Sequence, residues 1–193
     1  MSLLRTFIAI EIPKNIHNAI EEQTAGLKAA LGPSLVRWVP VDNIHLTLKF
    51  LGDISPTNVE LLAQMLSQEA SQQQAFEIQF EGLGVFPNQR RPRVLWIGIQ
   101  APAGLETLQH GIEAATTRLG YPAEVRPFSP HLTIGRVKQN VGGEGMQSIR
   151  TALQGARVGE LGRAPVKNLT LFKSELKPTG AEYTQLHAAP LAD

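Results

Sequence analysis

The 193-residue sequence contains no cysteine. This absence excludes disulfide bonds, thiolate catalysis and cysteine-ligated zinc or iron–sulfur centres. The sequence also lacks a run of about 20 apolar residues, which a membrane-spanning helix requires. The opening segment MSLLRTFIAIEIP is interrupted by Arg5 and ended by Glu11, which is untypical of a signal peptide. We therefore expect a cytoplasmic protein with no membrane partner.

Neither sign of charge is in large surplus, because 18 basic residues face 17 acidic ones and the formal net charge is +1. Proteins that coat nucleic acid without sequence preference need a large positive surplus, so this class is excluded. A small basic groove that holds one RNA end is still compatible with the composition. The apolar fraction of 42% is ordinary for a globular protein. The length predicts a single domain over residues 1–193, and we expect a monomer.

Short alternating apolar runs predict strands, and longer periodic segments predict helices. The predicted strands are Thr6–Ile12, Leu35–Val39, His45–Leu51, Phe76–Val85, Arg93–Gln100, His131–Val137, Val166–Leu176 and Glu182–Ala188. The predicted helices are Pro13–Leu31, Ser55–Ser71, Gly104–Leu119 and Glu144–Leu153. This order predicts an α+β fold with two pseudo-symmetric lobes, each with an antiparallel sheet and flanking helices. The active-site cleft is expected between the lobes.

One tetrapeptide, His-Leu-Thr-Leu at residues 45–48, recurs as His-Leu-Thr-Ile at residues 131–134. Side chains alternate along a strand, so histidine and threonine share one face and the aliphatic residues share the other. Residues two apart in a strand are separated by roughly 7 Å, which lets one phosphate group contact both. Two such strands brought together would place two imidazoles and two hydroxyls around one substrate.

This set of groups suits the opening of a cyclic phosphodiester without metal or cofactor. Water must lose a proton as it attacks phosphorus, and the departing ribose oxygen must gain one. Histidine performs either task near neutral pH, and hydroxyl donors stabilise charge on the non-bridging oxygens. A single His-x-Thr in a strand is usually structural, whereas two copies in matching contexts favour catalysis.

The sequence around both motifs resembles the 2H phosphoesterase superfamily, and more closely the bacterial RNA 2',3'-cyclic phosphodiesterases, also called the 2'-5' RNA ligase family. The resemblance spans essentially the whole chain. Its segments are RTFIAI at residues 5–10, VRWVPVDNIHLTLKFLG at 36–52, RRPRVLWIG at 90–98, PFSPHLTIGR at 127–136 and SELKPTGAEY at 174–183.

The resemblance implies hydrolysis of RNA 2',3'-cyclic phosphate ends to 2'-phosphomonoesters, with no cofactor and no metal. It makes His45 the proton donor to the departing 3' oxygen and His131 the proton acceptor that activates water. Thr47 and Thr133 would bind the phosphate. The residues alone do not distinguish acid from base. The partner implied is RNA with a cyclic phosphate end, including tRNA fragments, and the reverse reaction with a ribose 5'-OH would form a 2'-5' linkage.

Further substrate contacts are predicted near the motifs. Phe7 and Arg5 share a face of the first strand, where Phe7 would stack on a base or pack at the rim and Arg5 would meet a phosphate. Strand alternation places Lys49 on the same face as His45, where it would approach the substrate. The alternative is that Lys49 is a solvated lysine at the strand end. Strict alternation directs Arg136 away from His131, although a β-bulge would rotate it back.

The loop between the two central strands carries Arg90 and Arg91, which would guide an RNA backbone or merely solubilise the loop. Trp38 and Trp96 lie in apolar strands and are predicted in the core. Phe50 alternates with Leu48 and is predicted on the core face.

Three alternative functions are compatible with parts of this pattern. A metallophosphoesterase would need clustered carboxylates, and the second motif has none nearby. A non-catalytic nucleotide- or RNA-binding module of the same fold would not need paired proton donors. The same chemistry could also act on another small cyclic phosphate, such as ADP-ribose cyclic phosphate, or on a 2'-5' oligonucleotide.

Overall fold

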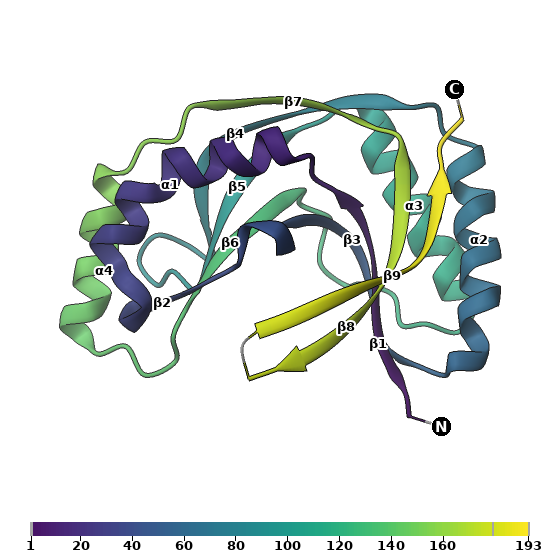
Figure 1. Cartoon of the computed structure of the whole chain (residues 1–193), viewed down its shortest axis with the longest axis horizontal. Helices are drawn as coiled ribbons and strands as arrows, with labels where there is room; N and C mark the ends of the chain where they lie inside the picture. The colour runs from purple at the N-terminus through teal and green to yellow at the C-terminus, as the bar shows by residue number, and fades with distance from the viewer. Residues whose placement is uncertain (1, 179, 193) are drawn as a thin grey trace.

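A computed structural model describes residues 2–178 and 180–192, and its strands form one continuous nine-stranded sheet (Figure 1). The strands are β1 (Leu4–Glu11), β2 (Val36–Trp38), β3 (His45–Ile54), β4 (Phe76–Phe86), β5 (Val94–Gln100), β6 (His131–Val137), β7 (Glu160–Val166), β8 (Asn168–Lys177) and β9 (Gly180–Pro190). The helices are α1 (Lys14–Leu35), α2 (Val59–Ser71), α3 (Ala103–Arg118) and α4 (Gly143–Gly155), with 3-10 turns η1 (Val41–Asn43) and η2 (Pro56–Asn58).

The strand order is β7-β4-β5-β6-β3-β1-β8-β9, with β2 paired to β6 outside this path, and all of the recorded strand pairs are antiparallel. The α+β class and the two related halves are therefore confirmed. The two half-sheets are joined edge to edge at β3 and β6, so the two motif strands are neighbours.

The two halves of the sheet do not correspond to the two halves of the chain. Reversing the strand order exchanges β6 with β3, β5 with β1, and β4 with β8. The repeating unit is thus β1-α1-β3-α2-β4 followed by β5-α3-β6-α4-β8. Each unit contributes its last strand to the half-sheet of the other, because β4 pairs with β5 and β8 pairs with β1.

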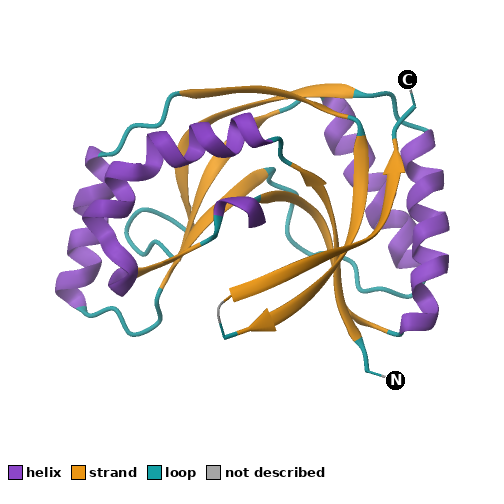
Figure 2. Ribbon diagram, viewed as in Figure 1, coloured by secondary structure: helices purple, strands orange, loops and turns teal. Residues whose placement is uncertain are grey.

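The helices cover one face of the curled sheet in two pairs (Figure 2). Helix α1 packs with α4, and α2 packs with α3. One main core joins these helices to the sheet, and it includes Leu46, Leu48, Leu132 and Ile134 from the two motif strands. Because these aliphatic residues face the helices, the alternating His and Thr side chains lie on the uncovered face.

Most predicted elements are confirmed, and the differences concern α1, α2 and β7. The helix predicted from Ser55 begins at Val59, because residues 56–58 form the 3-10 turn η2. Helix α1 continues past Leu31 to Leu35 across a kink at Gly32, whose φ of 58° suits glycine. Strand β7 was not predicted, because Gly162 and Pro165 interrupt its apolar alternation. Proline is tolerated there since β7 lies at the edge of the sheet. None of the helices that the structure describes is long and apolar enough to cross a membrane.

Candidate active site

The two motifs meet at the centre of the sheet, where Leu46 of β3 pairs with Leu132 of β6. In an antiparallel pair this register makes His45 the cross-strand neighbour of Thr133, and Thr47 the neighbour of His131. The four side chains therefore lie on one face in a diagonal arrangement, and each is partly exposed. A local pseudo-twofold axis passes through the pair of leucines.

Each motif imidazole is held in the same way by the backbone two residues earlier. Nδ1 of His45 donates a hydrogen bond to the carbonyl oxygen of Asn43 (2.8 Å), and Nδ1 of His131 donates to that of Ser129 (2.6 Å). A carbonyl can only accept, so Nδ1 carries the proton in both rings. Nε2 is consequently the nitrogen that is free to take or give a proton.

Aromatic side chains surround both imidazoles. The His45 ring stacks on Phe7 with centroids 4.7 Å apart and meets the edge of Tyr183 at 5.2 Å. The His131 ring lies edge-on to Phe86 at 4.9 Å and 6.2 Å from Trp96. These rings orient the imidazoles and reduce their contact with water, while leaving each ring partly exposed.

Burial lowers the pKa of both histidines, because desolvation disfavours the charged imidazolium. The hydrogen bonds to Asn43 and Ser129 act in the opposite direction and favour the protonated rings. The positive charge of Arg136 lowers the pKa of His131 further. Both imidazoles are therefore biased toward the neutral form in the free protein.

A β-bulge at the last residue of each motif changes which residues face the site. In β3, Ala9 pairs with Thr47 and Ile8 with Lys49, so Leu48 is the extra residue. In β6, Trp96 pairs with Thr133 and Leu95 with Gly135, so Ile134 is the extra residue. Two consecutive residues after each threonine are buried, and the alternation is then reversed.

The bulge in β3 makes the prediction for Lys49 wrong. Its side chain is 3% exposed, and Nζ lies 2.6 Å from Oε1 of Glu113 and 2.6 Å from the carbonyl oxygen of Pro122. The same carboxylate oxygen accepts a hydrogen bond from the backbone N–H of Glu124 (2.7 Å). Lys49 thus connects β3 to α3 and to the segment that precedes β6, and it does not lie on the face of the two histidines.

The prediction for Phe50 is wrong for the same reason. The residue is 62% exposed, and its ring lies beside that of Phe7, with centroids 6.0 Å apart. Phe7 itself is only 3% exposed, enclosed by His45, Phe172 and Tyr183. Phe7 therefore packs against His45 with almost no exposed surface, so the predicted stacking of Phe7 on a base is not supported, whereas Phe50 is exposed.

Past the bulge in β6, Arg136 lies on the same face of the sheet as His131 and is exposed, and its charge acts to lower the pKa of that histidine. Desolvation raises the pKa of the Tyr183 hydroxyl, and the charges of Arg136 and Arg5 act to lower it. Arg5 and Arg136 are both exposed. They come from β1 and β6, one in each half of the sheet.

The remaining predicted residues lie farther from the motifs or in the core. The backbone N–H groups of Arg90 and Arg91 donate to Oδ1 of Asn88 at 3.1 Å each, which fixes the turn between β4 and β5. Trp38 packs against the main core as predicted. The prediction for Trp96 is wrong, because it lies on the site face over Gly84, where an added Cβ would be 2.1 Å from the indole.

Three aromatic residues near the histidines are not predicted from the sequence: Tyr183, Phe86 and Phe50. Their positions depend on the β-bulges and on which strands pair, and a local sequence pattern indicates neither. One signal in the sequence could have found Phe50. It is the fifth residue after His45, as Arg136 is the fifth after His131. These equivalent positions carry an aromatic ring in one half and a cation in the other.

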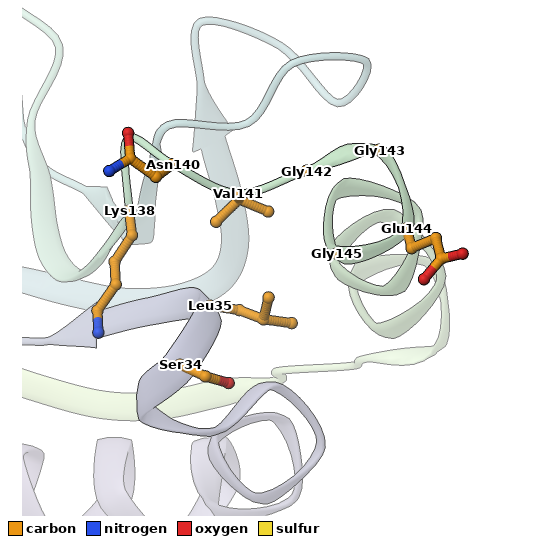
Figure 3. Close-up of a pocket in the computed structure, with 9 residues that line it drawn as sticks. All are labelled: Ser34, Leu35, Lys138, Asn140, Val141, Gly142, Gly143, Glu144 and Gly145. Carbon is orange, nitrogen blue, oxygen red and sulfur yellow. The ribbon is translucent and has the colours of Figure 1, made fainter.

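Among residues 2–178 and 180–192, no three His, Asp or Glu side chains converge as metal ligands would. A hollow of about 500 Å³ lies between the ends of α1 and α4 (Figure 3). Its lining includes Leu35, Lys138 and Val141 but no residue of either motif. It is therefore separate from the paired histidines.

Comparisons with known proteins agree with this geometry. A sequence model described as LigT like phosphoesterase matches the chain twice, over residues 10–96 and 97–183. The chain belongs to the LigT-like phosphoesterase family. The two matches agree with the pseudo-twofold relation of the sheet, since each contains one motif.

Individual proteins and solved structures are similar to this chain over nearly its whole length. Proteins named RNA 2',3'-cyclic phosphodiesterase from Methanothermobacter thermautotrophicus and Aquifex aeolicus are each 31% identical, over 95% of this chain and 96% and 95% of theirs. A Thermus thermophilus structure has a TM-score of 0.81 at 27% identity, covering 97% of this chain and 98% of that one. Escherichia coli LigT in complex with 3'-AMP has a TM-score of 0.77 at 28% identity and 99% coverage of both chains.

Proposed function

We propose that this protein hydrolyses RNA 2',3'-cyclic phosphate ends to 2'-phosphomonoesters by acid and base catalysis with two histidines. The observation that carries the proposal is the diagonal pair of imidazoles, each with Nδ1 bound to a backbone carbonyl and Nε2 free. The names of the archaeal and bacterial relatives support the substrate class. The E. coli family member in complex with 3'-AMP supports nucleotide binding by this fold.

In the proposed reaction, neutral His131 accepts a proton from water at Nε2 as the water oxygen bonds to phosphorus. Protonated His45 donates its Nε2 proton to the ribose O3' as the P–O3' bond breaks. The hydroxyls of Thr47 and Thr133 donate hydrogen bonds to the non-bridging oxygens, and the protonated Tyr183 hydroxyl supplements them. The products are a 2'-phosphomonoester and a free 3'-hydroxyl.

The two imidazoles are held equivalently, so the assignment of His45 as acid and His131 as base follows the family pattern. With a ribose 5'-OH attacking phosphorus in place of water and O3' leaving as before, the same geometry would make a 2'-5' linkage. Hydrolysis dominates in this proposal because water is the more abundant nucleophile.

The direct assay uses an oligoribonucleotide that ends in a 2',3'-cyclic phosphate, incubated with the protein in excess chelator. We expect complete conversion, with the phosphate on O2' by phosphorus NMR. No turnover of this substrate would contradict the proposed function. Activity that appears only after a divalent ion is added would contradict the metal-free scheme.

The pH dependence of kcat/KM is expected to be bell-shaped, because one imidazole must be neutral and the other protonated. Since burial lowers the pKa of both in the free protein, the maximum should lie on the acid side of the ordinary histidine value of about 6.5. Rate is lost above the maximum as the acid deprotonates and below it as the base protonates.

The bound anionic phosphate favours protonated histidine, so the basic limb of kcat should lie at higher pH than that of kcat/KM. The measurement is a pair of profiles from about pH 4.5 to 9. A flat profile, or a maximum of kcat/KM above about pH 8, would contradict two-histidine catalysis.

The exposed ring of Phe50 is expected to stack on the base of the terminal nucleotide. Because stacking contributes about 1–3 kcal/mol per base, Phe50→Ala should raise KM roughly tenfold with a smaller change in kcat. Phe50→Tyr should retain most of the affinity. Leu61→Ala on α2, which truncates an apolar residue that is 49% exposed, is the matched control. An unchanged KM for Phe50→Ala would exclude the stacking role.

A further inference from the structure

Two arginines face each other across adjacent strands beside the site. Strand β2 pairs with β6 over three residues, and Arg37 is directly opposite Arg136. The neighbours of Arg37, Val36 and Trp38, pack against the main core. Arg37 therefore points to the uncovered face, on the same side as Arg136, and both side chains are exposed.

Like charges placed directly opposite each other on antiparallel strands are destabilising. Among the residues that the structure describes, no ion pair involves Arg37 or Arg136. The Arg37–Arg136 pair therefore lowers the stability of the fold and has no carboxylate partner among the described residues. We expect an anion from outside the protein to bind the two guanidinium groups.

The turn between β4 and β5 brings further arginines to the same part of the sheet. The backbone N–H of Val137 donates to the carbonyl oxygen of Arg93 (2.9 Å), so this turn adjoins the end of β6. The side chain of Arg150 also bonds to the carbonyl oxygen of Arg90 (3.2 Å). We define the basic edge as Arg37, Arg90, Arg91 and Arg136.

The basic edge is a local surplus in a chain that is nearly neutral overall, with a net charge of +1. It begins on the motif strand itself, because past the bulge in β6 Arg136 lies on the same face of the sheet as His131 and Thr133. A polyanion lying on the edge would therefore be continuous with the phosphate between the histidines. RNA has this property, since successive phosphates follow the terminal one along the chain.

We propose that the basic edge binds backbone phosphates of the RNA on the 5' side of the cyclic end. Arg37 is then a specificity-determining residue, and the protein favours an oligoribonucleotide over a mononucleoside 2',3'-cyclic phosphate. This inference rests on the proposed function. It adds that the preferred substrate extends over several nucleotides on the 5' side of the cyclic phosphate.

The test compares Arg37→Gln with the unchanged protein on a ten-nucleotide RNA with a cyclic end and on a mononucleoside cyclic phosphate. The ratio of kcat/KM for the two substrates should fall about fivefold in the variant. The slope of log kcat/KM for the RNA against log salt should become shallower by about 0.7, the value for one phosphate contact with a single strand. Arg118→Gln, which removes an exposed arginine on α3, should change neither quantity.

The outcomes separate the two proposals. A ratio that is unchanged in Arg37→Gln, or equal losses on both substrates, would overturn the inference while leaving the hydrolysis intact. If neither substrate turns over, the proposed function fails. Binding of a fluorescent ten-nucleotide RNA with a 3'-hydroxyl end then tests the basic edge alone. Weaker binding by Arg37→Gln at low salt would support the edge, and equal binding would overturn it.

Discussion

Alanine at either motif histidine is expected to lower kcat by about 10³-fold, because general acid or base catalysis by a positioned side chain contributes about 10²–10⁴-fold. His45→Ala removes the proton donor and His131→Ala removes the proton acceptor. The double variant should lose little more than either single one, since the two groups act in the same step. Steady-state turnover of an RNA with a cyclic end measures all three losses.

Two controls test whether the loss of kcat is specific to the motif histidines and to the chemical step. His110→Ala, at an exposed position on α3, should retain full activity. The affinity of the two motif variants for a nucleoside 2'-monophosphate should stay within a few-fold of the unchanged protein, because the threonines still bind phosphate. A non-catalytic binding module would show no turnover to lose, and retention of more than about a tenth of kcat by either motif variant would reject the paired mechanism.

Lys49→Met is expected to lower the free energy of unfolding by about 3 kcal/mol, because it leaves the Glu113 carboxylate without its cation. The lysine side chain is 3% exposed and the glutamate 19%, so solvent screens the pair only weakly. The second carboxylate oxygen of Glu113 is already buried without a partner among the described residues. Urea denaturation followed by tryptophan fluorescence measures the change.

The double variant Lys49→Met/Glu113→Leu should recover much of the lost stability, since it removes both charges together. Lys173→Met, at an ion pair with Glu175 in which both side chains are at least 28% exposed, should cost about 0.5 kcal/mol or less. If Lys49 instead contacted substrate, Lys49→Met would lower kcat/KM and leave the free energy of unfolding unchanged.

The elements that could be predicted are those whose residues follow a simple period. Both motif strands begin at the predicted residue, His45 and His131, because His-x-Thr alternates with aliphatic residues that enter the core. The end of α2 at Ser71 was also predicted, and Ser55 accepts a hydrogen bond from the backbone N–H of Thr57 at the turn before that helix.

The differences arise where a contact distant in sequence decides the local geometry. The bulge in β3 depends on its register with β1, and nothing within HLTLKFLG indicates that Lys49 should turn inward. The pairing of Arg37 with Arg136 depends on β6 leaving β3 to meet β2. Period-two patterns identify strands and faces, but they do not identify an extra residue in a strand.

The interleaving of the two halves has the same origin. Strands β4 and β8 cross into the half-sheet that the other unit forms, a choice that no local pattern encodes. The sequence nevertheless shows the duplicated motif, because both copies must provide the same two groups on one face.

The most direct test of two-histidine catalysis uses a substrate whose leaving group needs no proton, a nucleoside 2'-phosphate p-nitrophenyl ester. With His45 as the acid, the loss of kcat in His45→Ala should shrink from about 10³-fold to less than about tenfold on this ester. The loss in His131→Ala should stay near its full value, because water must still be deprotonated. Equal losses in both variants on the ester and on the cyclic phosphate would contradict the division of roles between the two imidazoles.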